Sequence, residues 1–372
     1  MSLSGQRVLV SAISMHEAGP EVTRVARRAV LLGETGGGRV LSPSPVIHWP
    51  EVVGLRHIQL QAPPGAAPDA LAREVADRVG PALDRIRPQL VHVMGITAAV
   101  PVVMRRRAGL KVVVEPGITP SMALRAKDPD LPAARLADLA TLEDKVLARA
   151  DAVVARSTVE ASALVRRGVA SSKVITVRDP APTLESPGPL PALPQCLYVE
   201  GLQPWSGWQE LLHGMARVKV PWRLTLVVPD DGRAQPVRSL IQSLGLESQV
   251  TLARLDELPH RLRTSRLVIC PLRPEHAVLA GAVTPWGAHW SLASGRPLVA
   301  ADLPAIRAYT GPAARYFEAA HPGALAEAVT EMLTRPEEVE ALAEKGAHIQ
   351  AGANDAEQIL ADLWRRLQAS DP

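Results

Sequence analysis

The chain has 372 residues, of which 47% are hydrophobic and 21% charged, a composition typical of soluble globular proteins with two ordinary domains. Its formal net charge is only +3, and its basic residues are spread along the chain, which argues against a dedicated nucleic-acid-binding protein. No apolar run approaches the roughly 20 residues of a membrane span, and no cleavable leader is recognisable, so we expect a cytoplasmic protein without a transmembrane segment. The two cysteines, Cys196 and Cys270, lack metal-type spacing and are expected to be buried, reduced thiols.

Short apolar runs alternate with amphipathic segments along the first half of the chain. The runs are rich in β-branched residues and mostly uninterrupted, which is typical of strands covered on both faces. They span residues 7–14, 90–96, 111–117, 151–157 and 173–179. Helical patterns lie between them, for example over residues 20–33 and 136–150. The alternation predicts right-handed β-α-β units and a parallel sheet.

A proline-rich stretch interrupts this pattern at residues 179–195, where six of the seventeen residues are proline. So many prolines exclude a helix or a central strand and predict a stiff linker. The alternation then restarts, with strands expected at residues 196–201, 223–229, 250–254, 266–272 and 297–302. We therefore predict an α/β protein of two Rossmann-like, doubly wound parallel-sheet domains, with ligands at the carboxyl ends of the strands.

The predicted domain bounds are residues 1–180 and 195–350, with the linker at 181–194 and a C-terminal helix within 351–372. That helix is amphipathic and could pack on either domain; its apolar side carries Ile359, Leu360, Leu363, Trp364 and Leu367.

Three segments have sequence patterns that recur in a known family. They are ARADAVVARSTVEASALVRRGVASSKVITVRD at 148–179, LYVEGLQPWSGWQELLHGMARV at 197–218, and ICPLRPEHAVLAGAVTPWGAHWSLASGRPLVAADLPAIR at 269–307. Their order and spacing resemble the retaining, family-four glycosyltransferases of GT-B fold, over nearly the whole chain. The resemblance implies two domains facing across a cleft, a nucleotide diphosphate sugar as donor on the second domain, and a glycan, lipid or small-molecule acceptor on the first. It also implies that the last helix crosses back onto the first domain, and that no cofactor or metal is tightly bound.

The resemblance implies a donor site built from the second and third segments. Its residues would be Gly201, Trp205, Ser206, Arg273, Thr284, Pro285, Trp286, Gly287 and Trp290. A diphosphate leaving group needs cations or helix amino termini to compensate its charge. We expect Arg273 and the backbone amides of residues 284–287 to supply that compensation. Trp286 and Trp290 would offer an aromatic wall to a base or sugar, or alternatively would only fill volume.

The chain departs from the family at several donor positions. Trp290 stands where the family has a ribose-binding glutamate, and Gly287 stands where it has lysine or a similar polar group. Other departures are Ala282, Leu202, Ser206, Met94 and the pair Asp179–Pro180. Each well-placed donor that is lost costs roughly 2.7–4 kcal/mol of barrier, so several lost together could silence the reaction.

Candidate catalytic residues on the first domain follow two predicted strands. His16 and Glu17 come after the first strand, where they would touch an acceptor hydroxyl or act as a base, or would only favour a helix amino terminus. Glu115 ends the strand at 111–117, where it would contact ligand, or alternatively cap the neighbouring helix. Together with Arg273, which would stabilise the departing phosphate, His16 and Glu115 are the expected catalytic residues.

No metal site is expected from the remaining motifs. Asp128 and Asp130 have Asp-x-Asp spacing, but they lie in a proline-rich loop rather than after a strand. The glycines of residues 33–40 follow a helix and precede a strand, which is typical of a flexible turn and not of a phosphate loop. His276 and His289 lack zinc-type spacing. Two functions remain open: an active hexosyltransferase, and an inactive GT-B protein that serves as a binding module or as the partner of an active transferase.

Overall fold

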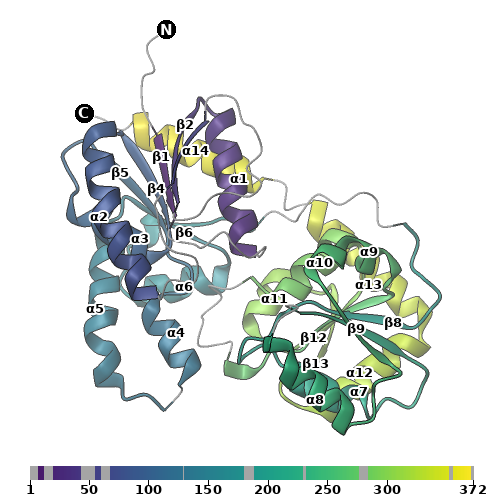
Figure 1. Cartoon of the computed structure of the whole chain (residues 1–372). Helices are drawn as coiled ribbons and strands as arrows, with labels where there is room; N and C mark the ends of the chain where they lie inside the picture. The colour runs from purple at the N-terminus through teal and green to yellow at the C-terminus, as the bar shows by residue number, and fades with distance from the viewer. Residues whose placement is uncertain are drawn as a thin grey trace. The chain divides into compact units, whose positions relative to one another are not determined.

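The structure is a computed structural model, and it describes residues 7–11, 20–42, 55–59, 68–128, 130–179, 188–228, 232–275, 284–351 and 355–369. The chain forms two compact units, whose helices and strands are labelled in Figure 1, with the colour following residue number. Unit 1 contains Met1–Asp179 and Asp355–Pro372, and unit 2 contains Pro180–Asn354.

Unit 1 is built on a seven-stranded parallel sheet with the order β3-β2-β1-β4-β5-β6-β7. The strands are β1 (Arg7–Ser11), β2 (Gly38–Ser42), β3 (Leu55–Gln59), β4 (Leu90–Met94), β5 (Lys111–Glu115), β6 (Ala152–Ala155) and β7 (Val174–Thr176). The helices are α1 (Pro20–Glu34), α2 (Pro68–Ile86), α3 (Ile96–Met104), α4 (Pro120–Lys127), α5 (Ala133–Arg149), α6 (Thr158–Arg166) and α14 (Ala356–Ala369), with the 3-10 turn η1 (Ser171–Lys173).

Successive side chains of each strand point to opposite faces of this sheet, which makes two cores. On one face, Val8 and Val10 of β1 pack in a cluster with apolar residues of α2, α3, α5 and α6. On the other face, Leu9 packs in a cluster with α1 and α14. The apolar strand runs thus mark a doubly wound sheet, as the sequence predicts.

The C-terminal helix α14 packs within unit 1. Leu360, Leu363 and Trp364 are buried in the cluster that contains Leu9, while Ile359 is exposed. The expected apolar side of this helix is therefore wrong at Ile359.

Unit 2 is built on a six-stranded parallel sheet with the order β10-β9-β8-β11-β12-β13. The strands are β8 (Gln195–Tyr198), β9 (Arg223–Val227), β10 (Val250–Ala253), β11 (Leu267–Cys270), β12 (Leu298–Ala301) and β13 (Ala314–Phe317). The helices are α7 (Trp208–Met215), α8 (Gln235–Ser243), α9 (Leu258–Thr264), α10 (Trp286–Ser294), α11 (Pro304–Thr310), α12 (Pro322–Thr334) and α13 (Pro336–Ala351), with the 3-10 turns η2 (Gly232–Ala234) and η3 (Leu255–Glu257).

The SGRP segment at the end of α10 has a structural role. Gly295 ends the helix with a left-handed φ of 63°, which glycine adopts without strain. The buried Arg296 guanidinium then donates hydrogen bonds to the carbonyls of Leu262, Arg263 and Pro189. The motif ties α10 to α9 and to the chain that enters unit 2.

Candidate functional site

The strand order of unit 2 defines where a ligand is expected. The chain runs outward from β8 to β10 on one side and from β11 to β13 on the other, so the order reverses between β8 and β11. In open α/β sheets, ligands bind at the carboxyl ends of the strands at such a reversal. The loops that follow β8 and β11 and the helix α10 are therefore the candidate site.

The two loops at this reversal contact each other through their backbones. Arg273 N donates to Trp205 O at 2.9 Å, and a Cβ on Gly207 would lie 1.8 Å from Pro271 O. Gly207 also has a φ of 71°, so only glycine fits this close approach. The buried Ser206 hydroxyl donates to Gln203 O at 2.7 Å, so its proton is committed to a hydrogen bond within the loop.

The N-terminus of α10 holds a carboxylate of the chain itself. Glu200 follows β8, and its Oε2 and Oε1 accept hydrogen bonds from Trp286 N at 3.0 Å and Gly287 N at 2.5 Å. Burial raises the pKa of the Glu200 carboxyl, against hydrogen bonds from the Cys270 thiol and the two amides. Two of the backbone amides expected to compensate a diphosphate, those of Trp286 and Gly287, therefore bind Glu200 in this structure.

Gly287 and Glu200 fit each other sterically. A Cβ on Gly287 would lie 2.7 Å from Glu200 Oε1 and 3.2 Å from Cys270 Cβ. Because such contacts are tighter than real Cβ atoms tolerate, a side chain at 287 would force Glu200 to move. Glycine at 287, where the family has lysine or a similar polar group, is thus the residue that leaves room for the Glu200 carboxylate.

Arg273 is partly exposed at the end of the loop after β11, where acidic residues hold it. Its Nη1 lies 3.1 Å from Glu210 Oε1, and its Nη2 lies 2.9 Å from Glu275 Oε1. The hydrogen bond to Glu275 raises the pKa of Arg273, so the group stays charged. A ligand phosphate would have to compete with two carboxylates for this guanidinium.

The tryptophans of α10 lie together. The rings of Trp286 and Trp290 meet edge to face at 6.2 Å between centroids, and both residues are partly buried. Trp290 packs against the core of unit 2, and its buried Nε1 has no hydrogen-bond partner among the described residues.

The other predicted positions around the start of α10 are buried. His289 contacts Tyr309 through a 2.5 Å Nδ1 to Oη hydrogen bond. Thr284 and Pro285 are buried where the helix begins.

In unit 1, Glu115 ends β5 as expected, but it is buried, with 2% of its surface exposed. Its Oε1 accepts from Arg28 Nε at 2.8 Å and lies 3.0 Å from His92 Nε2. Because His92 Nδ1 accepts from Trp364 Nε1 at 3.0 Å, the ring proton is on Nε2, the nitrogen that lies close to Glu115. Burial opposes ionisation of Glu115, yet Arg28 and His92 hold its pKa well below the ordinary value. The negative charge of Glu115 is therefore compensated by residues of unit 1.

A further buried ion pair and a buried carboxyl lie near the ends of the unit 1 strands. Arg24 of α1 pairs with Asp179, one of the residues at which the chain departs from the resembled family. Glu160 accepts from Arg156 N at 2.6 Å, and burial raises the pKa of Glu160 to about 7. The ion pair attaches α1 to the chain after β7 and gives Asp179 a structural role, while the Glu160 hydrogen bond holds the first turn of α6 to the end of β6.

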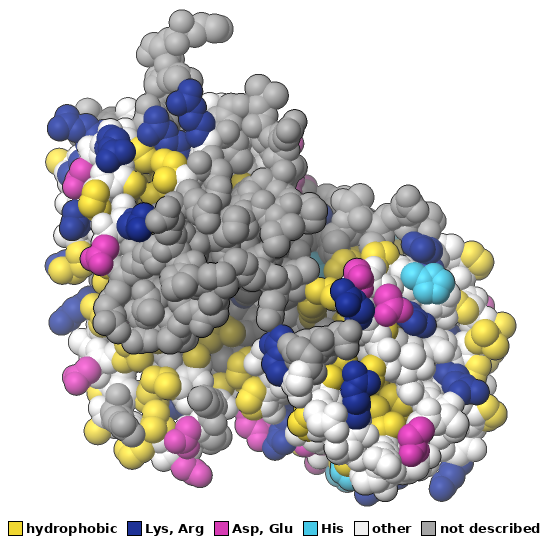
Figure 2. Space-filling view, in the orientation of Figure 1, with side chains coloured by type: hydrophobic (Ala, Val, Ile, Leu, Met, Phe, Trp, Pro, Cys, Tyr) yellow, Lys and Arg dark blue, Asp and Glu magenta, His cyan; other side chains and the backbone are white. Residues whose placement is uncertain are grey.

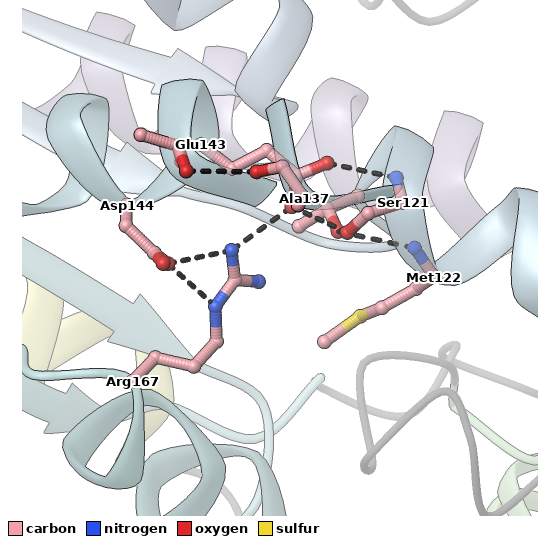
Figure 3. A network of polar contacts seen from close by, with 8 residues as sticks. Ser121, Met122, Ala137, Glu143, Asp144 and Arg167 are labelled. Carbon is pink, nitrogen blue, oxygen red and sulfur yellow. Dashed lines mark hydrogen bonds and ion pairs between the residues drawn. The ribbon is translucent and has the colours of Figure 1, made fainter. Parts of the chain in front are cut away.

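The helix after Glu115 is capped by other residues. Thr119 is the N-cap residue of α4, and Glu143 accepts from both Ser121 N at 2.8 Å and Ser121 Oγ at 2.6 Å. Arg167 links Glu143 to Asp144, so α4, α5 and α6 are held in one network (Figure 3). The alternative role of Glu115 as a helix cap is therefore wrong.

The residues predicted from the sequence fall in different parts of the structure. The nine donor-side residues all lie in unit 2, whereas Glu115 lies in unit 1 and His16 falls outside the described residues. Ala282 and His276 also fall outside them. Sequence reasoning missed Glu200; its signal was a carboxylate two residues after the strand, at the carboxyl end where a ligand is expected.

Other features of the described residues concern charge and metals. On the face shown in Figure 2, basic and acidic side chains are interspersed. Within the described ranges, no cluster of three or more His, Cys, Asp or Glu side chains could hold a metal ion, and no helix has the length and apolar character needed to span a bilayer. Both cysteines are buried free thiols, and burial raises the pKa of Cys196 to about 12.

Two family profiles match most of the chain. The profile described as "Glycosyl transferase 4-like domain" matches residues 5–179, and the profile "Glycosyl transferases group 1" matches residues 194–335. The chain belongs to the glycosyltransferases of GT-B fold. The family-four-like resemblance seen in the sequence is thereby confirmed, and so is the fold class of two Rossmann-like, all-parallel sheets.

Solved glycosyltransferase structures share this fold along their whole length. Sucrose-phosphate synthase from Thermosynechococcus elongatus superposes with a TM-score of 0.80 at 17% identity, covering 98% of this chain and 100% of that one. HepE of Anabaena in complex with UDP and glucose gives a TM-score of 0.71 at 15% identity, covering 97% and 100%. WaaG, a glycosyltransferase involved in lipopolysaccharide biosynthesis, gives 0.70 at 13%, covering 96% and 99%. Identities this low establish the fold alone. No curated protein sequence matches the chain.

Proposed function

We propose that this chain transfers a hexosyl unit from a nucleotide diphosphate sugar to an acceptor, with retention at the anomeric carbon and without a metal. The observation that carries the proposal is the N-terminus of α10, at the strand reversal of unit 2, where two backbone amides already bind a carboxylate. Helix N-termini bind phosphates through the same amides and the same dipole. HepE was solved with UDP and glucose, which supports UDP-hexoses as the first donors to test.

In this proposal the donor diphosphate lies beside α10, and Arg273 compensates the charge that develops as the diphosphate departs. To do so, the guanidinium exchanges Glu210 and Glu275 for phosphate oxygens. Trp286 and Trp290 face the base or the sugar. The surrounding backbone is supplied by Gly201, Trp205, Ser206, Thr284, Pro285 and Gly287.

The acceptor is assigned to unit 1. Glu115 and Arg28 are both too buried to touch an acceptor as they stand, so the proposed role of Glu115 is to hold Arg28 and His92 in place beneath the acceptor site. Orientation of the acceptor by His16 remains a proposal from the sequence. The acceptor is a glycan, a lipid or a small molecule.

Isothermal titration against UDP, GDP, ADP and dTDP, with and without Mg²⁺, tests the donor site. Binding of one nucleotide supports the proposal, and a requirement for Mg²⁺ would contradict its metal-free part. Transfer is then assayed with the sugars of that nucleotide, comparing Arg273→Ala with Arg254→Ala. Both changes remove one arginine of unit 2 that is paired with carboxylates, but Arg254 lies on the β10 side. We expect Arg273→Ala alone to lower kcat; equal rates in both variants would remove Arg273 from the mechanism.

A second candidate function is a catalytically inactive GT-B protein that binds a partner transferase. The observations that favour it are the carboxylate on the α10 amides, the carboxylates on Arg273, and Trp290 packed against the core. An absence of binding across the whole nucleotide panel would support this function over the first.

A further inference from the structure

The N-terminus of α10 is a strong position for an anion. The helix has nine residues, and its first two amides point at one carboxylate. Since the first turn of a helix carries unsatisfied amides and a partial positive charge, one bound anion satisfies both. Here the anion comes from the loop after β8.

Two anions cannot share these amides. A phosphate oxygen that accepted hydrogen bonds from Trp286 N and Gly287 N would occupy the place of the Glu200 carboxylate oxygens, and the two negative charges would repel at close range in a partly buried setting. Phosphate binding at α10 therefore requires Glu200 to leave.

The surroundings of Glu200 are adapted to its presence. Gly287 has no Cβ, and an added one would lie only 2.7 Å from Glu200 Oε1. Glu200 is only partly buried, and it precedes Gly201, whose φ is 73°. The side chain is thus held on α10 by two hydrogen bonds while the residue keeps some exposed surface.

We propose that Glu200 is an internal competitor of the donor, which holds the phosphate-binding amides of α10 and sets the donor affinity by the free energy needed to displace it. This inference rests on the proposed function, because it assumes that donor phosphates bind at α10. Glu200 makes no contact with the reacting atoms, so its role is to determine affinity and selectivity for the phosphates.

The test is isothermal titration of the full chain and its variants with UDP and with inorganic pyrophosphate. Glu200→Ala removes the competitor, Glu200→Gln keeps its shape without its charge, and Glu247→Ala is the matched control, because it removes an exposed negative charge of unit 2 away from α10. We expect Glu200→Ala to tighten both ligands by about tenfold or more, Glu200→Gln to tighten them less, and Glu247→Ala to leave them unchanged.

The outcomes separate this inference from the proposed function. If Glu200→Ala tightens pyrophosphate but neither it nor the unaltered chain binds any nucleotide, the competitor role stands and the nucleotide-sugar function fails. If UDP binds equally to all variants, the function stands and the competitor role is wrong. If no variant binds either ligand, the α10 amides are not a phosphate site and the inference is overturned. Should Glu200→Ala fail to fold by circular dichroism, the isosteric Glu200→Gln decides the question in the same way.

Discussion

Gly207 is the point where the two loops of the candidate site touch, and its replacement by alanine is the sharpest test of the site's architecture. Two costs combine in Gly207→Ala. An alanine at a φ of 71° costs about 1–2 kcal/mol. The added Cβ would lie 1.8 Å from Pro271 O, and because that atom is backbone, the loops must separate, which costs about 1–3 kcal/mol more.

Gly245→Ala is the matched control for this change. Gly245 has nearly the same φ, 66°, and lies in the same unit, but nothing stands within 4 Å of its added Cβ. It therefore incurs only the backbone cost of about 1–2 kcal/mol. The difference between the two variants isolates the contact of Gly207 with Pro271.

The assay is urea unfolding followed by tryptophan fluorescence, because Trp208 and Trp222 are buried in the core of unit 2 and report its transition. Gly207→Ala should unfold at a clearly lower urea concentration than Gly245→Ala, and should also weaken any nucleotide binding, because the displaced loop carries Trp205. Equal loss of stability in the two variants would refute the claim that the loops are held together at this glycine.

Two further predictions concern unit 1. Trp364→Phe keeps an aromatic ring in α14 but removes the hydrogen bond to His92 Nδ1 and leaves a cavity where the rest of the buried indole lay, so the unfolding free energy of unit 1 should fall by about 2–4 kcal/mol in urea titrations; an unchanged value would show that neither contact is needed to dock α14. Glu160 has a folded pKa of about 7 against an ordinary 4.5, so the folded state retains a proton that the unfolded state releases, and stability should fall as the pH rises from about 4.5 to 7. Glu160→Gln should flatten that decline, which is at most about 3 kcal/mol, in thermal unfolding measured across the same pH range.

The sequence predicted the central strands and missed three that lie at or near the sheet edges. Strands buried on both faces give uninterrupted apolar runs, such as LVHVM in β4, and these were all recognised. The missed strands β2, β3 and β13 contain GRVLS, LRHIQ and ARYF, where polar residues interrupt the run. β3 and β13 are edge strands, so their side chains need not be apolar throughout.

The candidate site was predictable only where it depends on local sequence. The position of Glu115 at a strand end follows from the pattern, but its burial follows from Arg28 and His92, which α1 and β4 bring from far along the chain. The contact of Glu200 with Gly287 joins residues 87 positions apart. Such contacts depend on the strand order, which periodicity does not specify.

The departure from the family at Gly287 has a physical basis in the structure, because Glu200 occupies the space beside it. Restoring lysine at Gly287 alone would place its Cβ against the Glu200 carboxylate, so the change would first displace Glu200 and only then offer a new cation. A gain in phosphate affinity after that substitution would therefore mix two effects, the loss of an internal anion and the addition of a charge. Only comparison with Glu200→Ala separates them, since that variant removes the anion and adds no cation. The absence of charged side chains on α10 is thus not by itself evidence of an inactive protein, because the backbone of the helix already binds an anion.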